Sequence, residues 1–182
     1  MWQNILEIYN RYPISELIIH PRTREDLYKK PVRYNTFEYA MENTGLKLCY
    51  NGDVFTKAAY KSICERFDGI NAIMLSRGIL KNPCLPQMIK EDKEIEADKI
   101  FEFHDKIYER YKDYMSGEVP VLFKMKEIWL YMQECFENSE KMIKKIKKSK
   151  NLREYDRIIQ EMKEEYLSLI HISEPTRLRR IS

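Results

Sequence analysis

The sequence lacks the signatures of several protein classes. Its four cysteines include no CxxC pair, and none stands at metal-finger spacing from a histidine. No run of about 18 apolar residues is present, so no membrane-spanning helix is predicted. The N-terminus has no basic segment followed by an apolar one, as a secretory signal peptide would. We therefore expect a cytoplasmic protein with reduced thiols, no metal site and no membrane association.

The composition is that of a folded protein with no strong charge bias. Hydrophobic residues make up 43% and charged residues 34% of the 182 positions, which is typical of globular rather than disordered chains. This length holds one ordinary domain or two small ones. The formal net charge of +3 permits an acidic partner such as nucleic acid but does not require one.

Residues 1–90 alternate helix and strand signals, the pattern of α/β architecture. Short apolar runs predict strands at 16–20, 46–50 and 71–75, and helices are predicted at 4–12, 36–43 and 56–67. The strands begin about 30 and 25 residues apart, the size of βα units in a parallel sheet. The sequence therefore predicts βα units of a parallel α/β fold.

Residues 91–167 have a different pattern, with the change placed near 88–94. Glycine becomes scarce, lysine and glutamate dominate, and the apolar period becomes helical. One predicted helix covers 96–115, with an apolar stripe of Ile100, Phe103, Ile107, Tyr111 and Tyr114. The next has a seam of Leu122, Met125, Trp129, Met132 and Phe136. Two more, at 139–148 and 152–166, complete a predicted antiparallel helical bundle.

Polar residues follow each of the three predicted strands. They form the clusters HPRTR at 20–24, NGD at 51–53 and SRG at 76–78. Alone, an Asn-Gly-Asp sequence is usually a turn, and a single histidine after a strand is usually structural. Because ligands of parallel α/β folds bind at the carboxyl ends of strands, three such clusters together indicate a site.

The same segments carry a resemblance to a known family. IHPRTR at 19–24, followed by YKKP at 28–31, resembles the IHxRTR…YKGP segment of tRNA-dihydrouridine synthases. YNGDV at 50–54 is similar to their ANGDI segment, and MLSRGILKNP at 74–83 to their MIGRGxLxNP segment. Order and spacing agree over about residues 4–166. The resemblance implies the C-terminal portion of a TIM (β/α)8 barrel, followed by an all-α tRNA-binding domain.

The resemblance also implies a chemistry. In this family NADPH reduces a bound FMN, hydride passes to C6 of a uracil in tRNA, and a cysteine protonates C5. The target base must leave the RNA stack. The FMN-binding positions would be His20, Asn51, Gly52, Asp53, Ser76 and Arg77. Arg22 and Arg24 would belong to a substrate or cofactor loop whose contacts the sequence leaves open.

The chain departs from the family pattern in three ways. Ser76 and Lys30 stand where the family usually has glycine, and Ser76 adds a side chain beside the expected phosphate loop. The early strands and the catalytic cysteine would precede Met1, so no cysteine of this chain receives the catalytic role. We expect this chain alone to be inactive and poorly behaved, because a half barrel exposes strand edges and apolar surface.

A dense run of basic residues predicts an RNA-facing surface in the helical part. The candidate tRNA contacts are Lys124, Lys126, Lys144, Lys145, Lys147 and Lys148. A solvated helix face would show the same composition, and the family resemblance favours RNA. We expect the full enzyme to be monomeric. The alternatives are a catalytically silent RNA-binding protein built from a truncated synthase, and a different FMN- or phosphate-binding TIM-barrel enzyme.

The last segment, 168–182, is predicted to be a non-native tail. It resembles one translated frame of a transposase end sequence used in preparing DNA sequencing libraries. We therefore exclude it from the interpretation of the fold, and we draw no meaning from His171.

Overall fold

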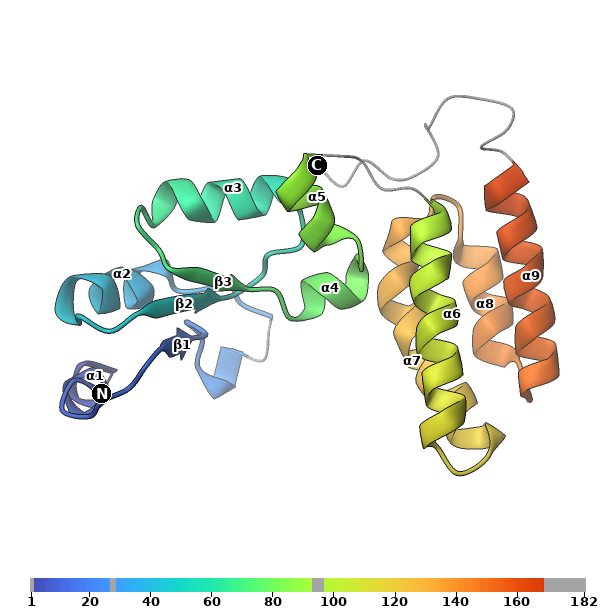
Figure 1. Cartoon of the computed structure of the whole chain (residues 1–182), viewed down its shortest axis with the longest axis horizontal. Helices are drawn as coiled ribbons and strands as arrows, with labels where there is room; N and C mark the ends of the chain where they lie inside the picture. Colours follow the sequence, from blue (N-terminus) through green and yellow to red (C-terminus); the bar gives the residue numbers. More distant parts are fainter. Residues whose placement is uncertain (1, 27–28, 93–96, 169–182) are drawn as a thin grey trace. The chain divides into compact units, whose positions relative to one another are not determined.

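The computed structural model describes residues 2–26, 29–92 and 97–168 (Figure 1). The chain divides into two compact units, Met1–Ser76 and Arg77–Ser182, and each is described by itself. From residue 169 on, the predicted tail lies outside the described residues. Tyr28 of the predicted loop motif also lies outside them.

The first unit is an α/β unit built on a small parallel sheet. Its elements are α1 (Trp2–Tyr9), β1 (Leu17–Ile19), the 3-10 helix η1 (Arg24–Asp26), α2 (Tyr34–Asn43), β2 (Leu48–Asn51), α3 (Lys57–Arg66) and β3 (Ala72–Met74). The strands lie in the order β1-β2-β3, and both neighbouring pairs are parallel. The prediction of three parallel strands with helical crossovers is confirmed, with ends shifted by one or two residues.

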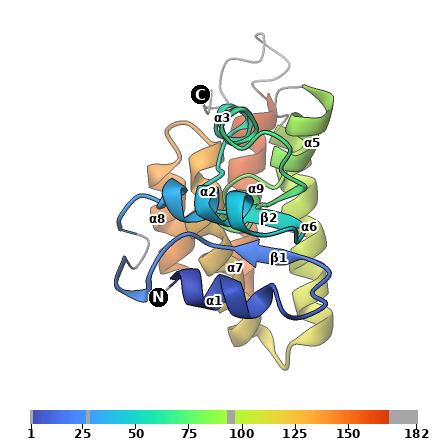
Figure 2. The ribbon, with the colours of Figure 1, turned by 90° about the vertical axis from the view of Figure 1, so that its left-hand side faces the viewer.

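Helices pack against one face of this sheet and leave the other face partly exposed. Successive side chains along a strand point to opposite faces. Helices α1, α2 and α3 flank the sheet (Figure 2). Tyr50, paired in register with Ile19 and Ile73, lies in the core formed with these helices. Its ring meets the Phe37 ring edge to face, with 5.2 Å between centroids. On the other face Ile18 is 46% exposed. The helices therefore cover one side of the sheet.

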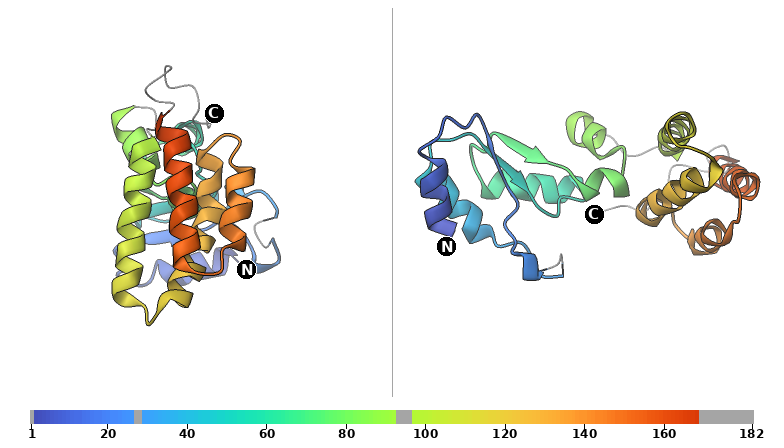
Figure 3. Two further views of the ribbon diagram at one scale, coloured as in Figure 1. Left: turned by 90° about the vertical axis from the view of Figure 1, so that its right-hand side faces the viewer. Right: turned by 90° about the horizontal axis from the view of Figure 1, so that it is seen from below.

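The second unit is helical in all its described elements. These are α4 (Arg77–Lys81), α5 (Leu85–Glu91), α6 (Ala97–Tyr114), α7 (Glu118–Met132), the 3-10 helix η2 (Gln133–Cys135), α8 (Glu140–Lys148) and α9 (Leu152–Ser168). Helices α6 to α9 pack around one apolar core (Figure 3). No helix in the described ranges is both long enough and apolar enough to cross a membrane.

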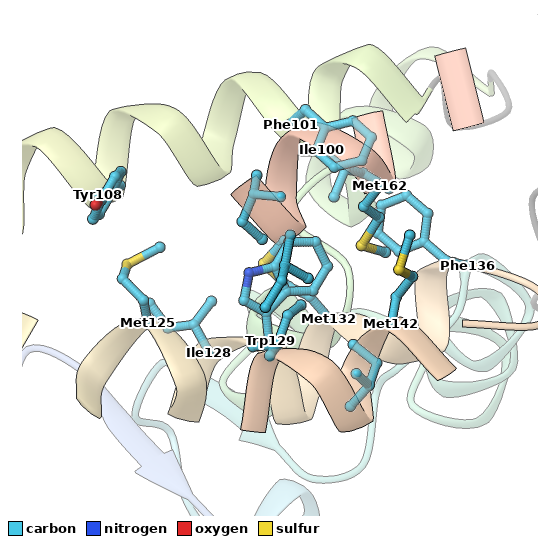
Figure 4. Packing of buried hydrophobic residues seen from close by; sticks show 14 of the residues in the cluster. Ile100, Phe101, Tyr108, Met125, Ile128, Trp129, Met132, Phe136, Met142 and Met162 are labelled. Atoms are coloured by element: carbon cyan, nitrogen blue, oxygen red, sulfur yellow. The ribbon is translucent and has the colours of Figure 1, made fainter. Parts of the chain in front are cut away.

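The core of this unit confirms one predicted stripe and extends another. Every residue of the seam predicted over 122–136 is buried, with Trp129 at its centre (Figure 4). On α6 Ile100 of the predicted stripe is buried and Phe103, Ile107 and Tyr111 pack against the core, whereas Tyr114 is 81% exposed. The buried face also includes Phe101, His104 and Tyr108, which the apolar count left out.

Helix α4 is tied to the helical unit. The Lys81 ammonium contacts the Glu134 carboxylate at 2.7 Å, and the Cys135 thiol donates to the Lys81 carbonyl at 2.8 Å. The compact units therefore divide at Ser76 and Arg77, whereas the sequence placed the change near 88–94. The assignment of cofactor binding to residues 1–90 and RNA binding to residues 91–167 stays a prediction.

Candidate functional site at the strand ends

The structure brings together the polar residues that follow the three strands. Since the sheet is parallel, the carboxyl ends of β1, β2 and β3 lie along one edge. His20 follows β1 directly, Asn51 ends β2, and Ser76 comes two residues after β3. The Ser76 hydroxyl donates to the Asn51 side-chain oxygen at 3.4 Å. The predicted clustering at this edge is confirmed, whereas the roles of its residues stay predictions.

Arg22 lies at the centre of the cluster with a side chain only 4% exposed. Its guanidinium forms a two-pronged ion pair with Asp53, with Nη1 at 3.0 Å from Oδ1 and Nη2 bonded to Oδ2. Nη1 also lies 3.2 Å from His20 Nε2. Nε and Nη2 both donate to the Lys30 carbonyl, at 3.0 and 2.8 Å. The hydrogen bond with Asp53 raises the pKa of Arg22 above its ordinary value.

Asp53 occupies an unusual backbone conformation. Its φ of 45° lies in the left-handed region, which costs energy for any residue other than glycine. The carboxylate of Asp53 is paired with the Arg22 guanidinium. Because a carboxylate and a phosphate repel each other, this side chain is a poor phosphate ligand.

Gly52 is buried, and its neighbours leave no room for a side chain. A Cβ at this position would lie 2.8 Å from Val32 Cγ1 and 2.9 Å from the Tyr50 hydroxyl oxygen. That hydroxyl is itself buried, and in the described part of the chain it has no hydrogen-bond partner. Burial raises the pKa of Tyr50. Packing under the turn is thus sufficient to require glycine here.

The loop after β1 is ordered by the buried carboxylate of Asp26. Asp26 accepts from the Thr23 amide at 2.8 Å and from Arg33 Nη2 at 2.9 Å. The Thr23 hydrogen bond lowers the pKa of Asp26. The Arg33 amide donates to the Pro21 carbonyl at 2.8 Å, which closes the loop. The sequence placed Arg22 and Arg24 in a loop here but did not predict these contacts.

The other two predicted site residues stand at the starts of helices. Arg24 is exposed at the start of η1. Arg77 begins α4 in the second unit, and its neighbour Gly78 is buried there. Their assignment to cofactor or substrate therefore depends on the resemblance alone.

The predicted RNA-facing lysines fall into two groups. Lys124 donates to Glu127 at 2.9 Å, Lys145 donates to Glu161 at 2.6 Å, and Lys126 donates to the Ser149 carbonyl. Three others are exposed on α8, on the side opposite its buried residues: Lys144, Lys147 and Lys148. The exposed group is the better candidate for binding phosphates, because its ammonium groups are not already paired with carboxylates among the described residues.

Sequence reasoning missed a buried polar network in the second unit. His104 Nε2 lies 2.6 Å from the Tyr155 hydroxyl, which also accepts from Trp129 Nε1 at 2.8 Å. His104 Nδ1 lies 2.9 Å from Asp105, and Lys163 donates to the same carboxylate at 2.7 Å. Burial lowers the pKa of His104. The one sign of this network in the sequence is a histidine within an apolar helical pattern.

Two of the four cysteines do not have the character of acids poised for proton transfer. Cys49 and Cys135 are buried, and burial raises the pKa of both thiols, to about 12 for Cys135. Among the described residues, no group of three or more side chains could hold a metal ion.

A parallel sheet that gathers polar side chains at its carboxyl edge defines an α/β protein of the ligand-binding kind. A family model described as dihydrouridine synthase matches residues 3–177, and the chain belongs to that family. The resemblance inferred from the sequence is thereby confirmed. The match reaches into the segment predicted to be non-native, so it does not separate that segment from the rest.

Curated relatives are similar over part of their length. The tRNA-dihydrouridine(16) synthase of Aquipseudomonas alcaligenes is 31% identical over 75 residues, which cover 41% of this chain and 24% of that protein. The tRNA-dihydrouridine synthase B of Shewanella oneidensis is 23% identical over 145 residues, which cover 71% of this chain and 42% of that protein. The chain spans less than half the length of these relatives.

Proposed function

We propose that this chain is part of a tRNA-dihydrouridine synthase, which reduces uridines of tRNA to 5,6-dihydrouridine with FMN as cofactor and NADPH as reductant. Family membership is the observation that carries the proposal. The names of the relatives support the substrate, since each is a tRNA-dihydrouridine synthase. Its place of action would be the cytoplasm, and the full enzyme would act as a monomer.

The side chains at the strand ends fit an FMN phosphate or flavin oxygens. The His20 ring and the Asn51 amide can donate hydrogen bonds, the Ser76 hydroxyl lies beside Asn51, and Arg77 follows directly in the sequence. The Asp53 carboxylate, which would repel a phosphate, is paired with Arg22. A bound FMN would supply the hydride for C6 of the uracil, after its own reduction by NADPH. This chain's residues would hold and orient it.

The two faces of the sheet support the barrel architecture. In a TIM barrel one face of each strand meets the surrounding helices and the other meets the barrel interior. Tyr50 lies on the helix side, whereas Ile18 lies on the other side and is 46% exposed. Strands β1, β2 and β3 would be the sixth, seventh and eighth strands of the barrel.

The exposed lysines of α8 would contact the tRNA backbone.

The proposal is tested by comparing FMN with riboflavin, which lacks the phosphate. Both are titrated into the full 182-residue chain by flavin fluorescence, after circular dichroism has verified its fold. Charge-assisted hydrogen bonds contribute about 1.5–3 kcal/mol each. We therefore expect FMN to bind at least about tenfold more tightly than riboflavin.

Equal affinities, or no binding of either flavin, would contradict the FMN site. If tRNA still bound in a gel-shift assay under those conditions, the catalytically silent RNA-binding protein would replace the synthase as the favoured function. Since no cysteine of this chain receives the catalytic role, we expect no dihydrouridine to form with this chain alone.

A further inference from the structure

We propose that Arg22 is a positioning residue of the FMN site, which fixes the ring proton of His20 and the shape of the turn at Asn51–Asp53 without touching the cofactor itself. This inference rests on the proposed function. The family resemblance left open whether Arg22 faces cofactor, RNA or its own neighbours, and the geometry assigns it to the neighbours.

The donors of Arg22 are fully used inside the unit. A guanidinium has five N–H groups and no acceptor. The structure shows five hydrogen bonds from it: two to Asp53, two to the Lys30 carbonyl and one to His20. With its side chain 4% exposed, Arg22 has neither surface nor a spare proton for a phosphate.

The contact with His20 determines which ring nitrogen carries the proton. Arg22 Nη1 can only donate, so His20 Nε2, at 3.2 Å, must accept. The neutral imidazole then carries its proton on Nδ1. A protonated ring is incompatible with this bond because both nitrogens would then be donors. Arg22 therefore makes His20 a neutral Nδ1–H donor.

The contact with Asp53 holds the turn after β2. Asp53 has a φ of 45°, a conformation that persists only where surrounding contacts enforce it. The two-pronged ion pair supplies such a contact and fixes direction as well as distance. Because the same guanidinium binds the Lys30 carbonyl, it joins the loop after β1 to the turn after β2. Both segments would have to be in place before FMN binds.

The decisive measurement is the tautomer of His20 in the unliganded wild-type chain, read by long-range proton–nitrogen NMR of histidine side chains. Loss of its signals in a His20→Gln variant assigns them. We expect a protonated Nδ1 and an unprotonated Nε2. In Arg22→Met we expect the Nε2–H form to appear. An Nε2–H tautomer in the wild type would overturn the inference. Because this measurement is made on the wild-type chain, it does not depend on whether an Arg22 variant folds.

FMN affinity gives the second reading. Arg22→Lys keeps the positive charge but cannot form the two-pronged ion pair with Asp53. We expect it to weaken FMN binding by about tenfold. Arg11→Met, at an exposed arginine of the same unit, serves as the control and should leave the affinity unchanged. Wild-type affinity in Arg22→Lys would overturn the positioning role.

The two proposals can fail separately. If the wild-type chain binds no FMN, the proposed function fails. If His20 nevertheless shows the Nδ1–H form in the wild type and loses it in Arg22→Met, the arrangement of Arg22 and His20 stands without that ligand.

Discussion

The indole N–H of Trp129 donates to the hydroxyl oxygen of Tyr155 across 2.8 Å in the core of the helical unit. Because an indole can only donate, the Tyr155 O–H is left to donate to His104 Nε2, 2.6 Å away. The proton of His104 then lies on Nδ1, which donates to Asp105. Each hydrogen bond of the network therefore has a fixed donor, from Trp129 through Tyr155 and His104 to Asp105, and the histidine must be neutral.

Replacing Tyr155 by phenylalanine should destabilise the helical unit. The change leaves the Trp129 N–H and the His104 ring buried without a partner, at a cost of about 1–3 kcal/mol each. Tyr108→Phe is the matched control, since its partner Asp156 is exposed and can bind water. We expect a loss of only about 0.5–1.5 kcal/mol there. Urea unfolding in a Trp2→Phe background, followed by Trp129 fluorescence, measures both; equal losses would contradict the network.

The helical unit should lose stability in mild acid. Burial lowers the pKa of His104 below its ordinary value of 6.5, so the unfolded chain binds a proton more readily than the folded one. The contribution of neutral His104 is therefore complete above about pH 6.5 and is lost as the pH falls. We expect the free energy of unfolding to decrease between about pH 7 and pH 5.5.

His104→Gln isolates this contribution because glutamine does not titrate. Its free energy of unfolding should change less with pH over the same range, while His20→Gln, in the other unit, should keep the wild-type dependence. The same Trp129 fluorescence assay applies. A wild-type pH dependence in His104→Gln would show that other groups cause it.

Periodicity predicted the elements well where the buried residues are apolar. On α7 the seam through Trp129 is buried as expected, because steps of three and four residues define one helix face. On α6 the same count found only part of the buried face: Ile100 is buried as predicted, but the count left out His104 and Tyr108 and included the exposed Tyr114. Whether a polar side chain can be buried depends on partners from α7 and α9, which no local pattern contains.

The candidate site shows the same limit. Strand prediction was enough to place His20, Asn51 and Ser76 at one edge, because parallel strands end on the same side. It could not reveal that Arg22 pairs with Asp53, 31 residues later in the chain. An arginine in a loop looks the same in sequence whether it faces solvent or is buried against a carboxylate from another loop.

Gly52→Ala should destabilise the first unit. The new Cβ would lie 2.8 Å from Val32 and 2.9 Å from the Tyr50 hydroxyl, and overpacking of this kind costs about 1–3 kcal/mol. Gly45→Ala is the control, because no atom lies within 4 Å of its Cβ position. We expect it to be neutral or slightly stabilising. Trp2 fluorescence in a Trp129→Phe background reports this unit, and equal effects would exclude crowding as the cause.

Neutralising the exposed face of α8 should weaken tRNA binding more than neutralising paired lysines. The triple variant Lys144→Gln, Lys147→Gln, Lys148→Gln removes ammonium groups that are exposed. Each lost phosphate contact lowers the slope of log affinity against log salt by about one. Gel-shift titrations of tRNA at several salt concentrations should therefore show a slope lower by about two to three.

The control is the pair Lys124→Gln and Lys145→Gln, whose ammonium groups already bind Glu127 and Glu161. Removing a lysine from such a pair leaves a carboxylate unpaired, but it removes no ammonium that was available to RNA. We therefore expect its salt slope to stay within about one of the wild type. If the control lost as much slope as the triple variant, the net charge of the helical unit, rather than the face of α8, would govern binding.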